Sequence, residues 1–281
     1  MAIGNSTELK KIREKMENEK RSYEQKLETE TDPRWRERIQ KLLAELNAKT
    51  PEQELEQRAE SQRSELERKE KAERERRHEN WLRIVGERGR RYAGCTLDNF
   101  RCDHPRQRES VESMREYASQ LHERVTNGDG VVLFGPPGTG KDHLLMALVM
   151  VAIRDHGLSV MWRNGLDLFA DFRRSINDDS EHDLVRPLIG ADILAISDPI
   201  PPFGAVTEYQ AGSIARIIDS RYSHCRPTWI TVNTANRDEA NQRLGSQAID
   251  RLSHGALVLH CDWPTYRAPR NRESRVSKTA G

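Results

Sequence analysis

The sequence predicts an α/β fold in which a parallel sheet carries helices on both faces, preceded by a long charged helical region. Two observations predict the sheet. After residue 130, short apolar strands alternate with amphipathic helices, and the first strand runs through a glycine-rich loop directly into a helix. A third observation predicts the helical region: residues 1–80 carry 20 Lys/Arg and 20 Asp/Glu, a composition typical of long exposed helices.

We expect residues 1–90 to form a charged, coiled-coil-like helical arm. A heptad-like seam begins at Leu9 and lapses after Tyr23, and Thr31-Asp32-Pro33 then starts a new helix with an apolar stripe. Thr50-Pro51-Glu52-Gln53 forms a capping box for a further, almost wholly polar helix. Because such narrow stripes do not support a domain alone, one interpretation is a partner-binding arm. The other is a solvated helix that packs loosely on its own domain or self-associates.

The composition excludes several classes of protein. A net charge of +1 gives the whole chain no electrostatic bias toward nucleic acid or membrane. Cys95, Cys102, Cys225 and Cys261 lie far apart, which favours a reducing cytoplasm over a disulfide framework or a zinc site. The longest apolar run, Leu144–Ile153, is about half as long as a membrane span. We therefore expect a soluble, cytoplasmic protein without a membrane partner.

The rest of the chain divides into a connector (91–130), a sheet domain (131–267) and a basic flexible tail (268–281). The turn sequence Asn127–Gly130 closes the connector. The expected strands are Val131–Phe134, Val160–Arg163, Ile193–Ser197, Thr228–Val232 and Ala256–Leu259, with helices at Lys141–His156, Gly165–Ile176 and Gln210–His224.

The loop after the first strand matches the phosphate-binding pattern G-x-x-x-x-G-K in its strand–loop–helix context. Its glycines let backbone N–H groups turn toward phosphates, and the helix N-terminus adds its positive dipole end. The lysine reaches the β and γ phosphates. We predict that the loop and the helix start bind ATP through Gly135, Pro136, Pro137, Gly138, Thr139, Gly140, Lys141, Asp142 and His143.

Two positions depart from the usual magnesium site of such loops. A Ser or Thr normally follows the lysine and holds Mg²⁺, but here Asp142 follows it. The third strand normally ends in an Asp, often followed by a Glu, and Ser197 and Asp198 take these two places. Shifting the register by one gives Asp198 the metal role and leaves Pro199 in the water-orienting place. Either way one carboxylate is missing.

We hypothesise that Asp142 takes over part of the metal-holding role, which makes Asp142 and Asp198 the candidate Mg²⁺ ligands. A carboxylate beside the phosphates would otherwise repel them by roughly a few kcal/mol. The alternative is that both positions have lost their metal-binding role and that ATP is bound without turnover. Hydrolysis of ATP to ADP and phosphate, where it occurs, is expected to be slow.

With these motifs in place, residues from about Tyr92 to Arg267 resemble the DnaC-type helicase loaders and the related IstB-like AAA+ ATPases. Cys95-Thr-Leu-Asp-Asn-Phe100 is similar to the segment before the core of these proteins, and Gly140-Lys-Asp-His-Leu144 to their G-K-N-H-L. The later segments that resemble loader segments are Ile217–Arg221, Arg226–Ile230 and Cys261-Asp-Trp-Pro-Thr-Tyr-Arg267.

The resemblance implies two further catalytic residues. Asn233, after the strand Thr228–Val232, matches the sensor position that contacts the γ-phosphate or the attacking water. Arg251 matches the arginine finger that reaches the ATP of a neighbouring subunit, which implies a homo-oligomer formed on ATP or DNA. The alternatives are an ordinary turn residue and a surface salt bridge. Because 14 residues follow Arg267, no separate lid domain is expected.

Nucleic-acid contact has weaker support in the sequence. Loaders use the region around Leu168–Arg174 to contact single-stranded DNA, so Arg173 and Arg174 are candidate DNA-binding residues. For Phe169 and Phe172 in the same helix we favour a place in the core. The basic clusters Arg83–Arg91 and Arg267–Lys278 are further candidates for phosphate contacts.

The leading functional hypothesis is a replicative helicase loader whose N-terminal helices bind the helicase and whose ATPase domain senses ATP and single-stranded DNA. The second is an IstB-like transposition helper that binds duplex DNA and a transposase. The third, of a different class, is a scaffold that binds DNA in an ATP-dependent way without hydrolysis.

Overall fold

The computed structural model describes residues 2–178, 180–200 and 206–267, so the predicted tail 268–281 lies outside the described residues. The chain divides into two compact units, Met1–Arg74 and Glu75–Gly281. Helix α3 (Pro51–Arg88) begins in the first unit and ends in the second.

The first unit consists of α1 (Ala2–Thr29), α2 (Pro33–Ala48) and the start of α3. The predicted helix break is confirmed, since the Asp32 carboxylate accepts from the backbone N–H of Arg34 at 2.8 Å and proline follows as the first helical residue. The predicted capping box is confirmed as well. Gln53 N–H donates to Thr50 Oγ1 at 3.2 Å, and Thr50 N–H donates to Gln53 Oε1 at 3.0 Å. In the helix after it, every residue from Glu56 to Arg76 is exposed.

The second unit contains a five-stranded parallel sheet in the order β2-β3-β4-β1-β5. The strands are β1 (Val131–Phe134), β2 (Val160–Asn164), β3 (Ile193–Ser197), β4 (Thr228–Val232) and β5 (Leu257–His260). The sequence located β1, β3 and β4 residue for residue. It placed β5 one residue early, because the pairing with β1 sets the register from Leu257 to His260.

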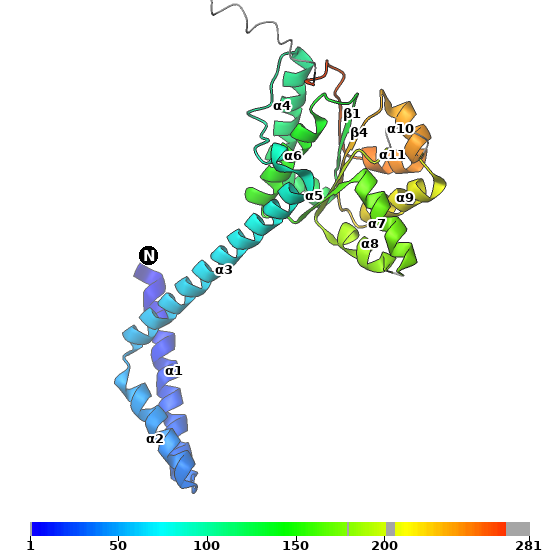
Figure 1. Ribbon diagram of the computed structural model, residues 1–281. Coiled ribbons are helices and arrows are strands. Elements are labelled where there is room, and N and C mark those ends of the chain that lie inside the picture. Colours follow the sequence, from blue (N-terminus) through cyan, green and yellow to red (C-terminus); the bar gives the residue numbers. More distant parts are fainter. Residues whose placement is uncertain (1, 179, 201–205, 268–281) are drawn as a thin grey trace, which may run out of the picture. The chain divides into compact units, whose positions relative to one another are not determined.

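Helices cover both faces of the sheet, as predicted (Figure 1). One face packs against the end of α3 and α4 (Pro105–Ser119), α5 (Leu121–Asn127) and α6 (Lys141–Arg154). The other packs against α7 (Gly165–Asn177), α8 (Glu181–Gly190), α9 (Glu208–Ser223), α10 (Arg237–Leu244) and α11 (Ser246–Ser253). Along β1, successive side chains alternate between the two cores, as the period of two in a strand requires.

The predicted connector is largely helical, and its helices α4 and α5 belong to the first of these cores. Tyr117 of α4 is buried, and its hydroxyl donates to the carbonyl of Asp129 at 2.5 Å and accepts from the indole N–H of Trp229 at 3.1 Å. Asn127 is the last residue of α5, and Gly128 follows it in the left-handed conformation (φ 81°). Glycine suits this place because it carries no Cβ.

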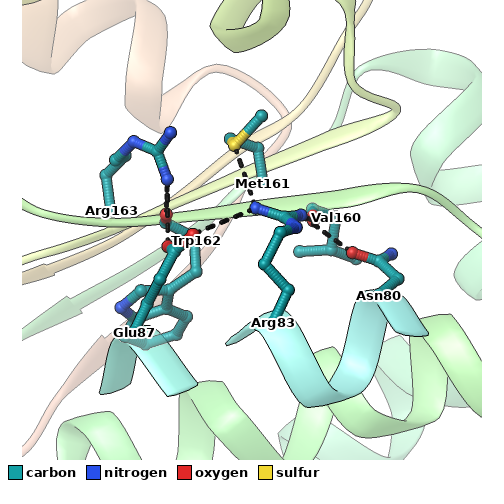
Figure 2. A network of polar contacts seen from close by, with 7 residues as sticks. All are labelled: Asn80, Arg83, Glu87, Val160, Met161, Trp162 and Arg163. Carbon is teal, nitrogen blue, oxygen red and sulfur yellow. Dashed lines mark hydrogen bonds and ion pairs between the residues drawn. The ribbon is translucent and has the colours of Figure 1, made fainter. Parts of the chain in front are cut away.

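The last turns of α3 lie along the edge strand β2 (Figure 2). The Arg83 guanidinium donates to the carbonyl of Val160 at 2.9 Å and to Asn80 Oδ1 at 2.9 Å. Arg163 of β2 donates to Glu87 of α3 at 2.9 Å. These contacts satisfy an open carbonyl of the edge strand and fix the end of α3 on the sheet domain.

Among the described residues, no helix combines the length and the apolar character needed to cross a membrane. In the same part of the chain, no group of three or more His, Cys, Asp or Glu side chains is arranged to hold a metal ion.

Candidate nucleotide-binding site

A cavity of about 270 Å³ lies beside the loop that joins β1 to α6. Three parts of the second unit line it: residues 91–101, the loop with the start of α6, and the segments that follow β3, β4 and β5. The charged lining residues are four cations and two carboxylates, namely Arg91, Arg101, Lys141 and Arg267 against Asp142 and Asp198. The excess of positive charge favours an anionic ligand.

The loop geometry requires glycine at two places. Gly138 and Gly140 have φ angles of 86° and 89°, which L side chains rarely adopt. A Cβ on Gly138 would lie 2.0 Å from Thr265 Oγ1, and a Cβ on Gly140 would lie 2.7 Å from the Phe100 ring. The two glycines therefore allow the loop to pass closely between residues 95–100 and the segment after β5.

The segment after β5 holds the loop in place. The buried indole of Trp263 donates to the carbonyl of Thr139 at 2.7 Å. The backbone N–H of Tyr266 donates to the carbonyl of Gly138 at 2.9 Å. The loop conformation is thus fixed by neighbours far away in the sequence, which lowers the entropy cost of binding a ligand.

Lys141, the first residue of α6, points back over the loop. Its ammonium donates to the carbonyls of Gly135 at 2.8 Å and Pro136 at 2.9 Å, and to Asn233 Oδ1 at 2.8 Å. Burial lowers the pKa of Lys141 from its ordinary value, and the nearby Asp198 opposes this shift. A phosphate group offers the lysine a charged acceptor in place of these neutral oxygens.

Asp198 follows β3 directly and lines the cavity. Burial, and after it the charge of Asp142, raise the pKa of Asp198 to about 6, while Lys141 and Asn233 act in the opposite direction. Its Oδ1 atom is buried without a hydrogen-bond partner. An orphaned buried carboxylate oxygen fits a hard cation such as Mg²⁺, which binds oxygen ligands.

Asp142 is surrounded by donors. Its Oδ1 accepts from the hydroxyls of Ser197 at 2.9 Å and Thr231 at 3.0 Å, two residues that face each other across β3 and β4. Its Oδ2 forms an ion pair with the guanidinium of Arg88, the last residue of α3. The carboxylate next to the phosphate loop and the hydroxyl at the end of β3 are therefore direct hydrogen-bond partners.

Part of the cavity lining is aromatic and lies against the phosphate loop at Gly140. Phe100 makes edge contacts with His143 (ring centroids 5.2 Å apart) and Tyr266 (5.8 Å), and Tyr92 lines the same space. His143 also contacts the carbonyl of Thr96 through Nε2 at 2.9 Å. The Arg101 guanidinium lies 4.8 Å from the Tyr266 ring centroid. A cavity lined by both flat rings and cations suits a ligand with a planar base and phosphates.

The structure brings most of the predicted residues together but not all of them. Asn233 contacts Lys141 inside the cavity. Arg251 of α11 instead pairs with Asp219 of α9 at 2.8 Å and does not line the cavity. Arg173 and Arg174 of α7 are exposed, and Arg174 pairs with Asp171. Phe169 and Phe172 are buried in the core, as we favoured.

Sequence reasoning missed Arg88, because one arginine in a uniformly charged helix gives no signal of a buried contact. It also assigned no role to Tyr92, Phe100 or Tyr266. The arginines of the basic cluster Arg83–Arg91 are not all open to solvent, since Arg88 is paired inside the unit.

A family model described as IstB-like ATP binding protein matches residues 36–274. The chain is 31% identical over 193 residues to the replicative helicase loader DnaC of Buchnera aphidicola subsp. Acyrthosiphon pisum, covering 66% of this chain and 75% of that protein. It is 27% identical over 188 residues to an insertion sequence ATP-binding protein of Sinorhizobium fredii, covering 65% and 60% of the two chains. A crystal structure of the DnaC helicase loader matches with a TM-score of 0.56 at 20% identity, covering 61% of this chain and 99% of that chain.

Proposed function

The chain belongs to the family of IstB-like ATP-binding proteins, AAA+ ATPases related to DnaC, and on that premise we propose that it binds ATP at Lys141 to control contact with a replicative helicase and single-stranded DNA. The motif resemblance predicted this family, and the prediction is confirmed. The observation that carries the proposal is the cavity in which the phosphate loop, an excess of cations and an aromatic wall meet.

In the proposed complex the phosphates lie against the loop and Lys141, and the base lies toward Tyr92, Phe100 and Tyr266. The lysine exchanges its loop carbonyls for phosphate oxygens, while Asn233 stays within reach of the γ-phosphate. The test is titration with ATP in calorimetry. Lys141→Ala is expected to lose ATP binding by at least about a hundredfold. Arg154→Ala, at the exposed far end of the same helix, is the matched control. It is expected to bind as the wild type does, and equal binding by all three proteins would reject the site.

For Mg²⁺ we propose Asp198 as the direct ligand, because its Oδ1 atom has no other partner. We propose that Asp142 takes part indirectly, by holding the hydroxyl of Ser197 next to Asp198, since both of its oxygens already have donors. When bound, the ion would neutralise charge on the phosphate oxygens. Asp198→Asn is expected to abolish the Mg²⁺ dependence of ATP binding, and Asp142→Ala to reduce it. Unchanged Mg²⁺ dependence in both variants would reject the metal site.

We propose that turnover is slow. Pro199 follows Asp198 in the place where related ATPases carry a water-orienting carboxylate, so the remaining groups polarise the phosphates without activating a water molecule. Lys141, Asp198 and Asn233 are the proposed catalytic groups, together with Arg251 acting on a neighbouring subunit. Phosphate release with and without single-stranded DNA is the measurement. Rapid turnover by the free monomer would contradict this proposal, and no turnover in any assembly would favour the non-hydrolysing scaffold.

We propose a cytoplasmic replicative helicase as the partner of the N-terminal helices and single-stranded DNA as the ligand of Arg173 and Arg174. The identity of 31% to a replicative helicase loader supports this choice, and so does the charged arm of residues 1–90. The insertion sequence relative keeps the transposition helper as the second candidate. Pull-down with the full chain and ATP separates the two: capture of a purified transposase rather than a purified helicase would reverse their order. Loss of single-stranded DNA binding in a variant that combines Arg173→Gln and Arg174→Gln would support the DNA contact.

A further inference from the structure

Arg88 lies outside the recognised motifs and contacts Asp142, the residue that follows the lysine of the phosphate loop. Its side chain is 16% exposed, and its guanidinium pairs with the carboxylate of Asp142, which is 15% exposed. The guanidinium lies 4.1 Å from the ring centroid of Tyr92 and 5.6 Å from that of Trp162. Two aromatic rings and one carboxylate therefore fix its position.

The contact matters because Asp142 stands where the loop would ordinarily offer a neutral hydroxyl. Lys141 precedes it, and Asp198 faces the same cavity, so two carboxylates and one lysine meet at the proposed phosphate site. Without a counter-charge, Asp142 would repel a triphosphate and compete with it for Lys141. The hydroxyls of Ser197 and Thr231 stabilise the carboxylate but do not cancel its charge.

We propose that Arg88 is a positioning residue for the triphosphate: it neutralises Asp142 from outside the cavity, so that a phosphate loop with a carboxylate after its lysine accepts an anionic nucleotide. Arg88 does not itself line the cavity, so it acts through Asp142 and not by touching the ligand. This inference rests on the proposed binding of ATP at Lys141.

An electrostatic role predicts that the loss on removing Arg88 grows with the charge of the ligand. In Arg88→Gln the affinity for ATP is expected to fall by at least about tenfold, the affinity for ADP by less, and that for adenosine by less than about twofold. The loss for ATP is expected to shrink at high salt, because salt screens partly exposed charges. A collapsed cavity would instead lower the affinity for all three ligands together.

The decisive experiment tests whether removing the charge of Asp142 restores ATP binding to the Arg88 variant. Arg88→Gln combined with Asp142→Asn is expected to bind ATP within about threefold of Asp142→Asn alone, since the carboxylate that needs neutralising is gone. Arg83→Gln is the matched control, because Arg83 lies on the same helix and its contacts are with β2 and with its own helix (Figure 2). It is expected to bind all three ligands as the wild type does.

The outcomes are separable. If the wild type fails to bind ATP, the proposed function is rejected. If the wild type binds and Arg88→Gln binds equally well, Arg88 has no such role. If Arg88→Gln weakens adenosine as much as ATP, or if Asp142→Asn gives no rescue, Arg88 only supports the end of α3 and the inference is overturned.

Discussion

The two units of this chain differ in how much of their apolar side chains they bury. In the described part of the first unit the buried apolar side chains are Ile12, Met16 and Ile39, and most of the other side chains are exposed. In the second unit β1, β3 and β4 are buried along their whole length between two layers of helices. Since apolar burial is the main favourable term in folding, the second unit has its own source of stability and the first has little.

The same contrast applies to their charged groups. Arg13 and Glu52 form an ion pair at 3.7 Å in the first unit, with side chains 60% and 58% exposed. Arg221 in the second unit is fully buried. Exposed ion pairs contribute little, while a buried charge needs hydrogen-bond partners to offset the loss of water. Charges thus keep the first unit solvated and hold particular segments together in the second.

Arg221 is the place where this comparison predicts the largest effect. Its guanidinium donates to backbone carbonyls at 2.8–3.1 Å, linking the end of α8 to the start of β4; the acceptors are Leu188, Ile189, Ala191, Asp192 and Pro227. Burial lowers the pKa of Arg221 to about 9, so it remains charged at pH 7. Arg221→Met is expected to lower the free energy of unfolding by about 3–5 kcal/mol, because buried carbonyls lose their donors.

Urea denaturation of the full chain measures this change, and Arg13→Met in the first unit serves as the control. That control is expected to change stability by less than about 0.5 kcal/mol. If Arg221→Met lowered the free energy of unfolding as little as Arg13→Met does, the charged groups of the two units would not differ in their contribution to stability.

The thiols give a pH test of burial in the second unit. Burial raises the pKa of Cys95 to about 11 and that of Cys261 to about 12, whereas Cys225 is exposed. Because the thiolate is the reactive form, Cys95 and Cys261 are expected to alkylate at least about a hundredfold more slowly than Cys225 at pH 8. Their rates should rise with pH toward 11, and on unfolding. Mass spectrometry of timed iodoacetamide reactions provides the measurement, and equal rates at the three sites would show that the second unit is loosely packed.

A core deletion in the first unit should stay local. Ile39→Ala removes one of the few buried side chains between α1 and α2, and about 2 kcal/mol of local stability is expected to be lost. Hydrogen exchange should then accelerate in α1 and α2, while the strands of the sheet keep their protection. Faster exchange in β1 and β4 would mean that the two units unfold together.

The comparison also explains what could be predicted from the sequence. The strands of the second unit were found because buried parallel strands are short apolar runs, and the phosphate loop because its glycines and lysine are local in sequence. Helix starts were found at Asp32 and Thr50 because caps are local too.

Contacts between distant parts of the chain left no such signal. Arg88 and Asp142 are separated by 54 residues, and Tyr266 contacts Phe100 from the other end of the second unit's sequence. A charged side chain in a helix has the same local pattern whether it faces water or a buried carboxylate. The sequence therefore predicted the glycine-rich loop but not the residues that hold it in place or the arginine that pairs with Asp142.

The smallest expected effect concerns the exposed apolar face of α2, where Trp35 is 56% and Leu42 is 37% exposed. These residues are seven apart and lie on one helix face, with the Arg38 guanidinium 5.8 Å from the Trp35 ring centroid. Because little apolar area is buried there, Trp35→Ser is expected to change the free energy of unfolding of either unit by less than about 0.5 kcal/mol. If the arm binds a helicase, the same variant should weaken that complex, since an exposed tryptophan contributes strongly to interfaces. Calorimetric melting and helicase pull-down on this one variant therefore separate stability from binding. A large loss of stability would mean that this face of α2 is packed in a core. Unchanged melting with a weakened pull-down would mean that the exposed face of α2 is the surface that binds the helicase.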